Sequence, residues 1–247
     1  MPATMTRLLA LGDSAWTIEF GDSISPELNA QVMALAQQIE LTREHDLLLE
    51  NVIDVVPTFR SLTVHFAPLK TDAQALARHL MALAQQLTPH ELNGRQWRLP
   101  ACFDKSFAPD LSDLAASKQM SESKVIEQLL ATTFRVYMIG FLPGFPYMGG
   151  LPKALATPRL KTPRQRVPKN SLAVAGEMCA VYPWESPGGW NLIGRTPVSL
   201  FDLQHAQQPA LLAAGDTVTW YEISQEEYAD LSATYQTGPT PREAFLR

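Results

Sequence analysis

Cysteine is scarce in this chain of 247 residues, which contains two of them, Cys102 and Cys179. Two cysteines provide neither a disulfide framework nor a four-ligand metal site. The five histidines are scattered, with none at ligand spacing from another, so we expect no metal centre in this chain. No apolar run approaches the roughly 20 residues that span a bilayer, and the first residues lack the apolar region of a signal peptide. These absences predict a globular, cytoplasmic protein.

Positive charge is also in deficit, because 20 Lys and Arg face 25 Asp and Glu, for a net charge of −5. This balance argues against a partner made of nucleic acid or an acidic membrane surface. Segment 140–197 is the exception, with seven basic and two acidic residues and therefore a charge of +5, which leaves −10 for the rest. The same segment holds nine of the 19 prolines and eight of the 13 glycines. We expect the functional site in this stiff, locally basic segment.

Motifs for catalysis by this chain alone are missing. No nucleophile elbow occurs, and segment 140–197 contains two carboxylates, Glu177 and Glu185. A carboxylate pair for general acid–base catalysis is therefore hard to assemble there. Cys179 lies in an expected strand, where a buried, unreactive thiol is the usual outcome. We therefore predict that the segment binds an anion, and the catalytic residues remain unknown.

The first ninety residues follow the pattern of a small α/β unit. Alternating apolar residues predict strands at 16–20 and 62–66, and an apolar run predicts another at 47–56, stopped by the following proline. Ser25 has the features of an N-cap ahead of a first helix, and Thr71 begins a capping box ahead of a second. The order suggests two strand-strand-helix units that form one open sheet with both helices on one face.

The turn-rich stretch 88–95 is the expected domain boundary, with the break near residue 92. We therefore predict an α+β protein with a small α/β domain at 1–92 and a second domain at 93–247. Many short strands separated by Pro and Gly favour a closed or partly closed β-barrel in the second domain. The expected strands are 96–99, 134–139, 171–175, 179–182, 191–193, 198–201 and 216–223, with short helices at 110–117 and 121–131.

The segment 140–150, GFLPGFPYMGG, is the densest motif. Its glycines allow backbone N–H groups to approach a ligand, its prolines fix the path, and its aromatic residues supply flat walls. Such a loop suits an anionic or planar ligand. A rigid barrel corner explains the same residues equally well.

Two arginines follow in a near-repeat, Thr-Pro-Arg, that ends at Arg159 and again at Arg164. The prolines keep this segment extended, and the odd spacing places the two side chains on opposite faces of a regular strand, so at most one need face a site. A guanidinium group matches a carboxylate or a phosphate with two hydrogen bonds. Segment 182–190, YPWESPGGW, and the Gly-Arg-Thr-Pro at 194–197 add further aromatic, glycine and basic residues. The full set of candidate binding residues is Gly140, Phe141, Pro143, Gly144, Phe145, Pro146, Tyr147, Arg159, Arg164, Tyr182, Ser186, Gly188, Gly189, Trp190 and Arg195.

These three motifs, in this order, resemble the allophanate hydrolase subunit 1 family. The resemblance is dense over about 134–222 and includes the stretch 100–115, whereas the first ninety residues agree in organisation only. Members of this family include the B subunit of the bacterial ATP-dependent 5-oxoprolinase and an inhibitor of a sporulation histidine kinase. The resemblance implies that the second domain is a cyclophilin-like β-barrel.

For function, the resemblance implies one component of an ATP-dependent hydrolase that opens the ring of 5-oxoproline to give glutamate. The implied partners are proteins like the C subunit and the A subunit of the same enzyme, and the implied cofactor is ATP, with Mg²⁺ supplied by the complex. This chain would contribute binding surface for a small carboxylate substrate or for the nucleotide. Two alternatives stay open: a regulatory module that inhibits a histidine kinase, and a carboxyltransferase-type subunit related to urea carboxylase.

The chain departs from the family pattern at three places. It has Leu129 where members commonly carry histidine, and Thr133-Phe134 in place of Glu-Tyr. Met178-Cys179-Ala180 stands in place of Gln-Thr-Gly, and Asn170 in place of glycine. Asparagine tolerates left-handed backbone geometry, so the last change is mild.

Overall fold

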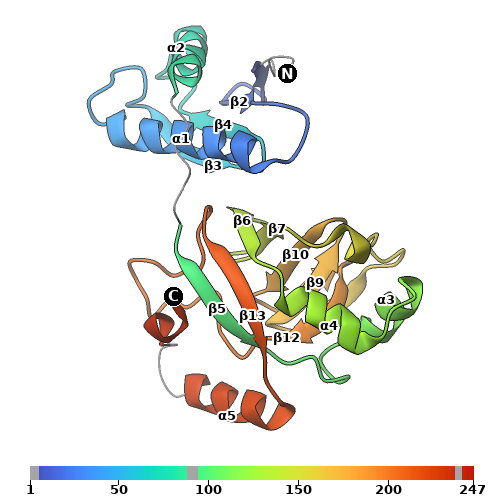
Figure 1. Cartoon of the computed structure of the whole chain (residues 1–247). Helices are drawn as coiled ribbons and strands as arrows, with labels where there is room; N and C mark the ends of the chain where they lie inside the picture. Colours follow the sequence, from blue (N-terminus) through green and yellow to red (C-terminus); the bar gives the residue numbers. More distant parts are fainter. Residues whose placement is uncertain (1–5, 88–93, 237–240) are drawn as a thin grey trace. The chain divides into compact units, whose positions relative to one another are not determined.

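The computed structural model describes residues 6–87, 94–236 and 241–247, and divides the chain into two compact units, 1–92 and 93–247 (Figure 1). Most of the expected boundary, residues 88–93, lies outside the described residues. Each unit has a hydrophobic core of its own.

The first unit is a four-stranded antiparallel sheet in the order β1-β2-β4-β3, with two helices. Its helices pack on one face, because Leu62, Val64 and Phe66, which alternate along β4, share one apolar cluster with residues of both helices. The prediction of one open sheet with both helices on the same face is thereby confirmed. The elements are β1 (Arg7–Ala10), β2 (Ala15–Glu19), α1 (Pro26–Thr42), β3 (Val52–Pro57), β4 (Ser61–Phe66) and α2 (Ala73–Gln86).

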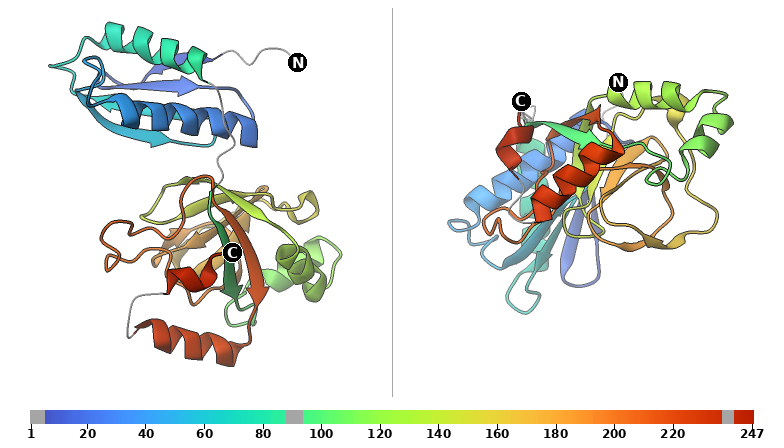
Figure 2. Two further views of the ribbon diagram at one scale, coloured as in Figure 1. Left: turned by 60° about the vertical axis from the view of Figure 1, so that its left-hand side comes forward. Right: turned by 90° about the horizontal axis from the view of Figure 1, so that it is seen from below.

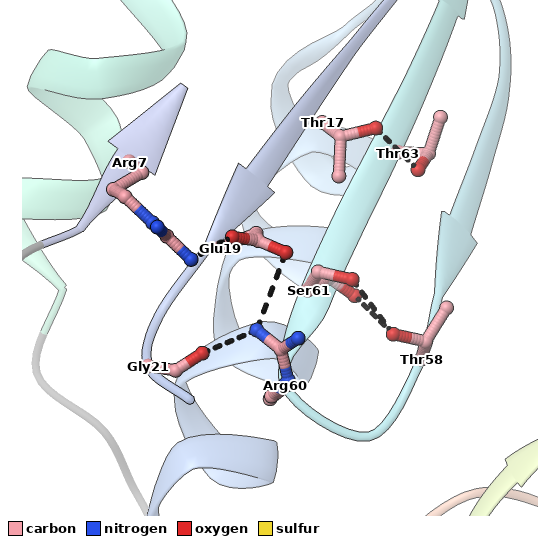
Figure 3. A network of polar contacts seen from close by, with 8 residues as sticks. All are labelled: Arg7, Thr17, Glu19, Gly21, Thr58, Arg60, Ser61 and Thr63. Carbon is pink, nitrogen blue, oxygen red and sulfur yellow. Dashed lines mark hydrogen bonds and ion pairs between the residues drawn. The ribbon is translucent and has the colours of Figure 1, made fainter. Parts of the chain in front are cut away.

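The other face of this sheet carries a network of polar contacts (Figure 3). Glu19 accepts hydrogen bonds from Arg7 and Arg60, at 2.6 and 3.2 Å, and Arg60 also donates to the carbonyl of Gly21. The hydroxyl groups of Thr17 and Thr63 lie 2.9 Å apart across the paired strands β2 and β4. This face agrees with the period-two pattern of the strands, which places polar residues opposite the helices.

Local details of the first unit correct two predictions. Ser25 does cap α1, since its hydroxyl accepts from the backbone N–H of Leu28, but α2 is capped by Asp72 rather than by Thr71. The strand expected at 47–56 begins only at residue 52, because 47–51 form turns. Pro57 does not stop this strand but belongs to it, and β3 is an edge strand, where a missing N–H is tolerated.

The second unit contains one seven-stranded sheet in the order β12-β9-β10-β7-β6-β13-β5 (Figures 1 and 2). All pairs are antiparallel except β13 with β5. The strands are β5 (Gln96–Ala101), β6 (Phe134–Ile139), β7 (Pro146–Gly149), β9 (Ser171–Ala175), β10 (Met178–Tyr182), β12 (Asn191–Arg195) and β13 (Thr217–Glu222). A separate two-stranded ribbon joins β8 (Arg164–Val167) to β11 (Ser186–Gly188). The helices are α3 (Leu111–Ser117), α4 (Glu122–Leu130) and α5 (Gln225–Gln236), with 3₁₀ turns η1 (Lys153–Leu155) and η2 (Arg242–Phe245).

The sheet curls until its two edges meet at one point. Cys102, directly after β5, and Arg195, the last residue of β12, exchange backbone hydrogen bonds of 2.8 and 2.9 Å. A Cβ on Gly194 would lie 3.0 Å from the carbonyl oxygen of Cys102, so glycine suits this approach. The chain is therefore a mixed α+β protein with a curled half-barrel sheet, and the cyclophilin-like label stays a prediction.

Several expected elements differ in the structure. Residues 198–201 are not a strand: Phe201 makes an isolated bridge with Ala210, and the backbone N–H of Val198 turns to the hydroxyl of Thr196. Val198 and Leu200 are nevertheless buried, which explains the strand-like apolar pattern. Strands β7, β8 and β11 and helix α5 are not predicted by the sequence patterns.

Strands β9 and β10 are buried on both faces. In β10, Cys179 and Val181 belong to the main core inside the curled sheet, whereas Ala180 and Tyr182 belong to a second apolar cluster on the outside. Phe145 and Trp190 complete that outer cluster, together with smaller residues of β9 and β12. The outer cluster is the base on which the candidate site is built.

Asp216 provides a test of the second unit's stability. Its buried carboxylate accepts from the backbone N–H groups of Arg95 and Ala213, at 2.9 Å each, and from the indole N–H of Trp97 at 2.8 Å. Because Asp216→Ala leaves these donors unpaired in the interior, we expect a loss of about 3–5 kcal/mol in the free energy of unfolding, measured by chemical denaturation. Exposed Asp230→Ala is the control, and an equal loss in both variants would contradict this role.

Candidate functional site

A pocket of about 270 Å³ opens on the outer cluster of the second unit. Four chain segments form it: the loop between β6 and β7 together with the start of β7, the extended segment before β8, the end of β10, and β11 with the turn that follows it. The lining residues are Phe141, Phe145, Tyr147, Arg159, Pro163, Tyr182, Pro187, Gly188, Gly189 and Trp190.

The pocket walls are aromatic rings packed edge to face. Phe145 is buried, and its ring centroid lies 4.9 Å from that of Tyr147, 5.1 Å from that of Tyr182 and 6.0 Å from that of Trp190. Edge-to-face contacts of this kind stabilise a fixed arrangement of rings. The pocket is thus formed before any ligand arrives.

The loop between β6 and β7 contains a strained residue at the pocket mouth. Phe141 has φ of 67°, and the backbone N–H of Leu142 donates to the carbonyl of Gly140 at 2.8 Å, which makes a tight γ-turn with positive φ. This turn is rare and strained, and a bulky residue at positive φ is an outlier. The turn holds the Phe141 side chain 61% exposed beside the pocket. Strain at such a place points to function.

Tyr182 packs closely against the glycine turn at residues 188–189. The Tyr182 hydroxyl accepts a hydrogen bond from the backbone N–H of Trp190. A Cβ on Gly188 would lie 2.4 Å from the Tyr182 hydroxyl, whereas a Cβ on Gly189 would meet Pro163 at an ordinary 3.7 Å. Gly188 is therefore required by close approach, and Gly189 is not.

Arg159 is the one charged residue among those that line the pocket. Its guanidinium carbon lies 5.9 Å from the centroid of the Trp190 ring. Burial raises the pKa of Tyr147 and of Tyr182, and the positive charge of Arg159 acts on both in the opposite direction. The lining thus combines a single cation, apolar walls and no carboxylate, an arrangement that suits a small planar anion.

Eight of the fifteen predicted residues line the pocket: Phe141, Phe145, Tyr147, Arg159, Tyr182, Gly188, Gly189 and Trp190. The other seven lie outside the lining. Gly140, Pro143, Gly144 and Pro146 support the loop: Gly144 has φ of 80° and packs against Phe201. Ser186 is buried in β11 beside the pocket. Arg164 and Arg195 do not line the pocket.

Arg164 and Arg195 make contacts within the second unit instead. Arg164 donates to Asp110 at 2.6 Å, in a partly buried ion pair. Arg195 lies over the ring of Phe107 at 4.9 Å and donates to the hydroxyl of Tyr228. Of the two arginines in the near-repeat, Arg159 lines the pocket and Arg164 does not, in agreement with the expectation that at most one need face a site.

The departures from the family pattern fall in different environments. Met178 packs on the outer cluster beneath the pocket, and Ala180 belongs to it, whereas Cys179 points into the main core, where burial strongly raises its pKa. Leu129 is buried in the main core and Thr133 is exposed, so neither belongs to the pocket. Asn170 has φ of 62°, the left-handed geometry expected for it.

Two lining residues were missing from the predicted set, Pro163 and Pro187. Both lie inside the quoted motifs, next to Arg164 and to Ser186. Proline fixes the path of the chain and also offers a flat apolar surface to a ligand, and this second property is the signal by which both residues could be found.

Metal clusters and membrane spans are both absent from the described part of the chain. Across 6–87, 94–236 and 241–247, no cluster of three or more His, Cys, Asp and Glu side chains is placed to hold a metal ion. The helices in these ranges are too short or too polar to span a membrane.

The fold and the site define a mixed α+β protein with a ligand-sized aromatic pocket on the outside of a curled sheet. The chain belongs to the carboxyltransferase domain family, subdomains C and D, whose model matches residues 6–212. It is 37% identical over 232 residues to the 5-oxoprolinase B subunit of Bacillus subtilis (strain 168), covering 88% of this chain and 93% of the relative. It is 36% identical over 212 residues to the 5-oxoprolinase B subunit of Haemophilus influenzae, covering 86% and 95%. These findings confirm the family resemblance of the motifs.

Solved structures share the fold of this chain. The crystal structure of TTHA0988 matches with a TM-score of 0.72 and 32% identity, over 89% of this chain and 40% of that chain. The chain therefore spans less than half of the TTHA0988 chain. The urea amidolyase of K. lactis shares the fold, with a TM-score of 0.77 at 20% identity over 93% of this chain and 16% of that one.

Adjacent glycines test the geometry of the pocket. Gly188→Ala places a methyl group against the Tyr182 hydroxyl, so we expect it to destabilise the second unit by about 1–3 kcal/mol and to alter the tryptophan fluorescence. Gly189→Ala adds the same atom where there is room and should change stability by less than about 0.5 kcal/mol. Thermal unfolding of both variants makes the comparison, and equal effects would contradict the packing described.

Titration of Tyr147 tests the electrostatics of the pocket. A nearby positive charge favours the phenolate, so Arg159→Ala should raise the pKa of Tyr147 further above its usual value, because burial is then less opposed. NMR of labelled tyrosine rings, assigned with Tyr147→Phe, measures this shift. A lower pKa after the substitution would show that Arg159 does not face the ring.

Proposed function

We propose that this chain is a component of an ATP-dependent 5-oxoprolinase, and that its pocket binds the carboxylate substrate. The reaction adds one water to the ring amide of 5-oxoproline to give glutamate, while a second water accounts for the hydrolysis of ATP to ADP and phosphate. The identity with 5-oxoprolinase B subunits over most of both chains supports the assignment to such a complex. Proteins like the C subunit and the A subunit of that enzyme are the proposed partners.

The observation that carries the substrate role is the position of Arg159 over an aromatic pocket. A five-membered lactam is nearly flat and has two apolar methylene groups, which suit the faces of Tyr147 and Trp190. Its carboxylate matches the guanidinium of Arg159. The pocket, at about 270 Å³, lies just below the roughly 300–1,000 Å³ that hold drug-sized ligands, so a small ring carboxylate is the appropriate size.

The same lining does not fit ATP with Mg²⁺. A triphosphate requires several cations or a cradle of backbone N–H groups, and Mg²⁺ requires oxygen ligands such as carboxylates. Among the lining residues, Arg159 is the only cation and no carboxylate occurs. We therefore place the nucleotide, its metal and the groups that move protons on the partner proteins. This chain binds and orients the substrate.

A carboxyltransferase-type role is the second candidate, since the family model and the urea amidolyase fold both favour it. It requires transfer of a carboxyl group from biotin. Protection of loop 140–145 from proteolysis by a biotin analogue, with no response to 5-oxoproline, would support this candidate over the hydrolase.

Arg159→Ala tests the proposed function in the reconstituted complex of all three proteins. Loss of the charged hydrogen bonds to the substrate should lower kcat/KM for 5-oxoproline about 10- to 100-fold, mainly through KM, while the complex still assembles. The exposed neighbour Lys161 is the control, and Lys161→Ala should change kcat/KM by less than about twofold. Release of glutamate and ADP is the measurement. No turnover by the complete wild-type complex would contradict the proposed function, and an unchanged Arg159→Ala variant would contradict the role of the pocket.

A further inference from the structure

The ribbon of β8 and β11 forms one wall of the pocket and is separate from the main sheet. Pro163 directly precedes β8, and Pro187 and Gly188 belong to β11. Arg164 pairs with Gly188 across the ribbon. The contacts that attach Arg164 to the rest of the second unit therefore fix the position of this wall.

Asp110 makes that attachment without lining the pocket itself. One carboxylate oxygen accepts from Nη2 of Arg164 at 2.6 Å, and the other accepts from the backbone N–H of Leu192 at 2.6 Å. The backbone N–H of Asp110 donates in turn to the carbonyl of Leu192 at 3.1 Å. The buried carboxylate of Asp110 thus joins the ribbon to β12. It binds β12 at Leu192, two residues after the lining residue Trp190.

The burial of this contact distinguishes it from the other ion pair of the ribbon. The side chains of Arg164 and Asp110 are 28% and 12% exposed, whereas those of Arg166 and Glu185 are 78% and 51% exposed. Exposed pairs contribute little, but removal of one partner from a partly buried pair leaves an uncompensated charge. The ribbon therefore offers two ion pairs, of which only the buried one is expected to hold the wall.

We propose that Asp110 is a positioning residue for the pocket, which fixes the wall at Pro163 and Gly188 through Arg164 and the Trp190 segment through Leu192. The substrate part of this proposal rests on the proposed function. Asp110 does not line the pocket, and it acts through the two groups that it holds. It also neutralises Arg164, which leaves Arg159 as the cation that a bound carboxylate meets.

A double-mutant cycle tests this role in the complete complex. Asp110→Asn should raise KM for 5-oxoproline about tenfold while kcat stays within about twofold, because the wall is displaced but the reacting groups are not. Arg164→Met should have a similar effect. The double variant should be no worse than the more affected single variant, since both substitutions break one contact. Glu185→Gln removes the exposed pair and should leave both parameters unchanged.

Hydrogen exchange of the same variants gives a readout that does not depend on activity. Faster exchange at 186–192 in Asp110→Asn, and not in Glu185→Gln, is the expected result. An unchanged KM in Asp110→Asn, additive effects in the double variant, or equal exchange at 186–192 in Asp110→Asn and Glu185→Gln would overturn the proposal. If the wild-type complex does not turn over 5-oxoproline, the proposed function fails, and the exchange comparison alone decides whether Asp110 holds the wall.

Discussion

The burial of β9 and β10 on both faces is the constraint on which the rest of the second unit depends. A strand inside a curled sheet normally has one face in the core and one in solvent. Here the inner residues of β10, such as Cys179 and Val181, fill the main core, so the outer residues need a separate apolar cover. The loop before β7 and the ribbon of β8 and β11 supply that cover, and the pocket is the space left between them.

This arrangement also explains how a basic segment becomes a site with one cation. Of the four arginines in segment 140–197, Arg164 and Arg166 are paired with carboxylates and Arg195 lies over Phe107. Arg159 faces the pocket over Trp190 instead. Three of these four arginines therefore stabilise the ribbon and the closure of the sheet, and one lines the pocket.

The sequence allowed more of the fold than of the site to be predicted. Period-two patterns predicted β2 and β4, and Ser25 predicted the start of α1, because these signals are local. The strand predicted from the apolar run 198–201 is wrong, because Val198 and Leu200 are buried without pairing in a β-ladder. In the site, the Gly, Pro and aromatic motifs predicted most lining residues. The ion pair of Arg164 with Asp110 spans 54 positions and has no local signal, so the sequence did not indicate that Arg164 is turned away from the pocket.

A structure of the complete complex with 5-oxoproline would show whether the aromatic pocket is the substrate site. We expect the ring against the pocket lining at Tyr147 and Trp190, with its carboxylate on the guanidinium of Arg159 and the nucleotide bound on another protein of the complex. A pocket filled by side chains of a partner protein, with 5-oxoproline bound away from Arg159, would contradict it.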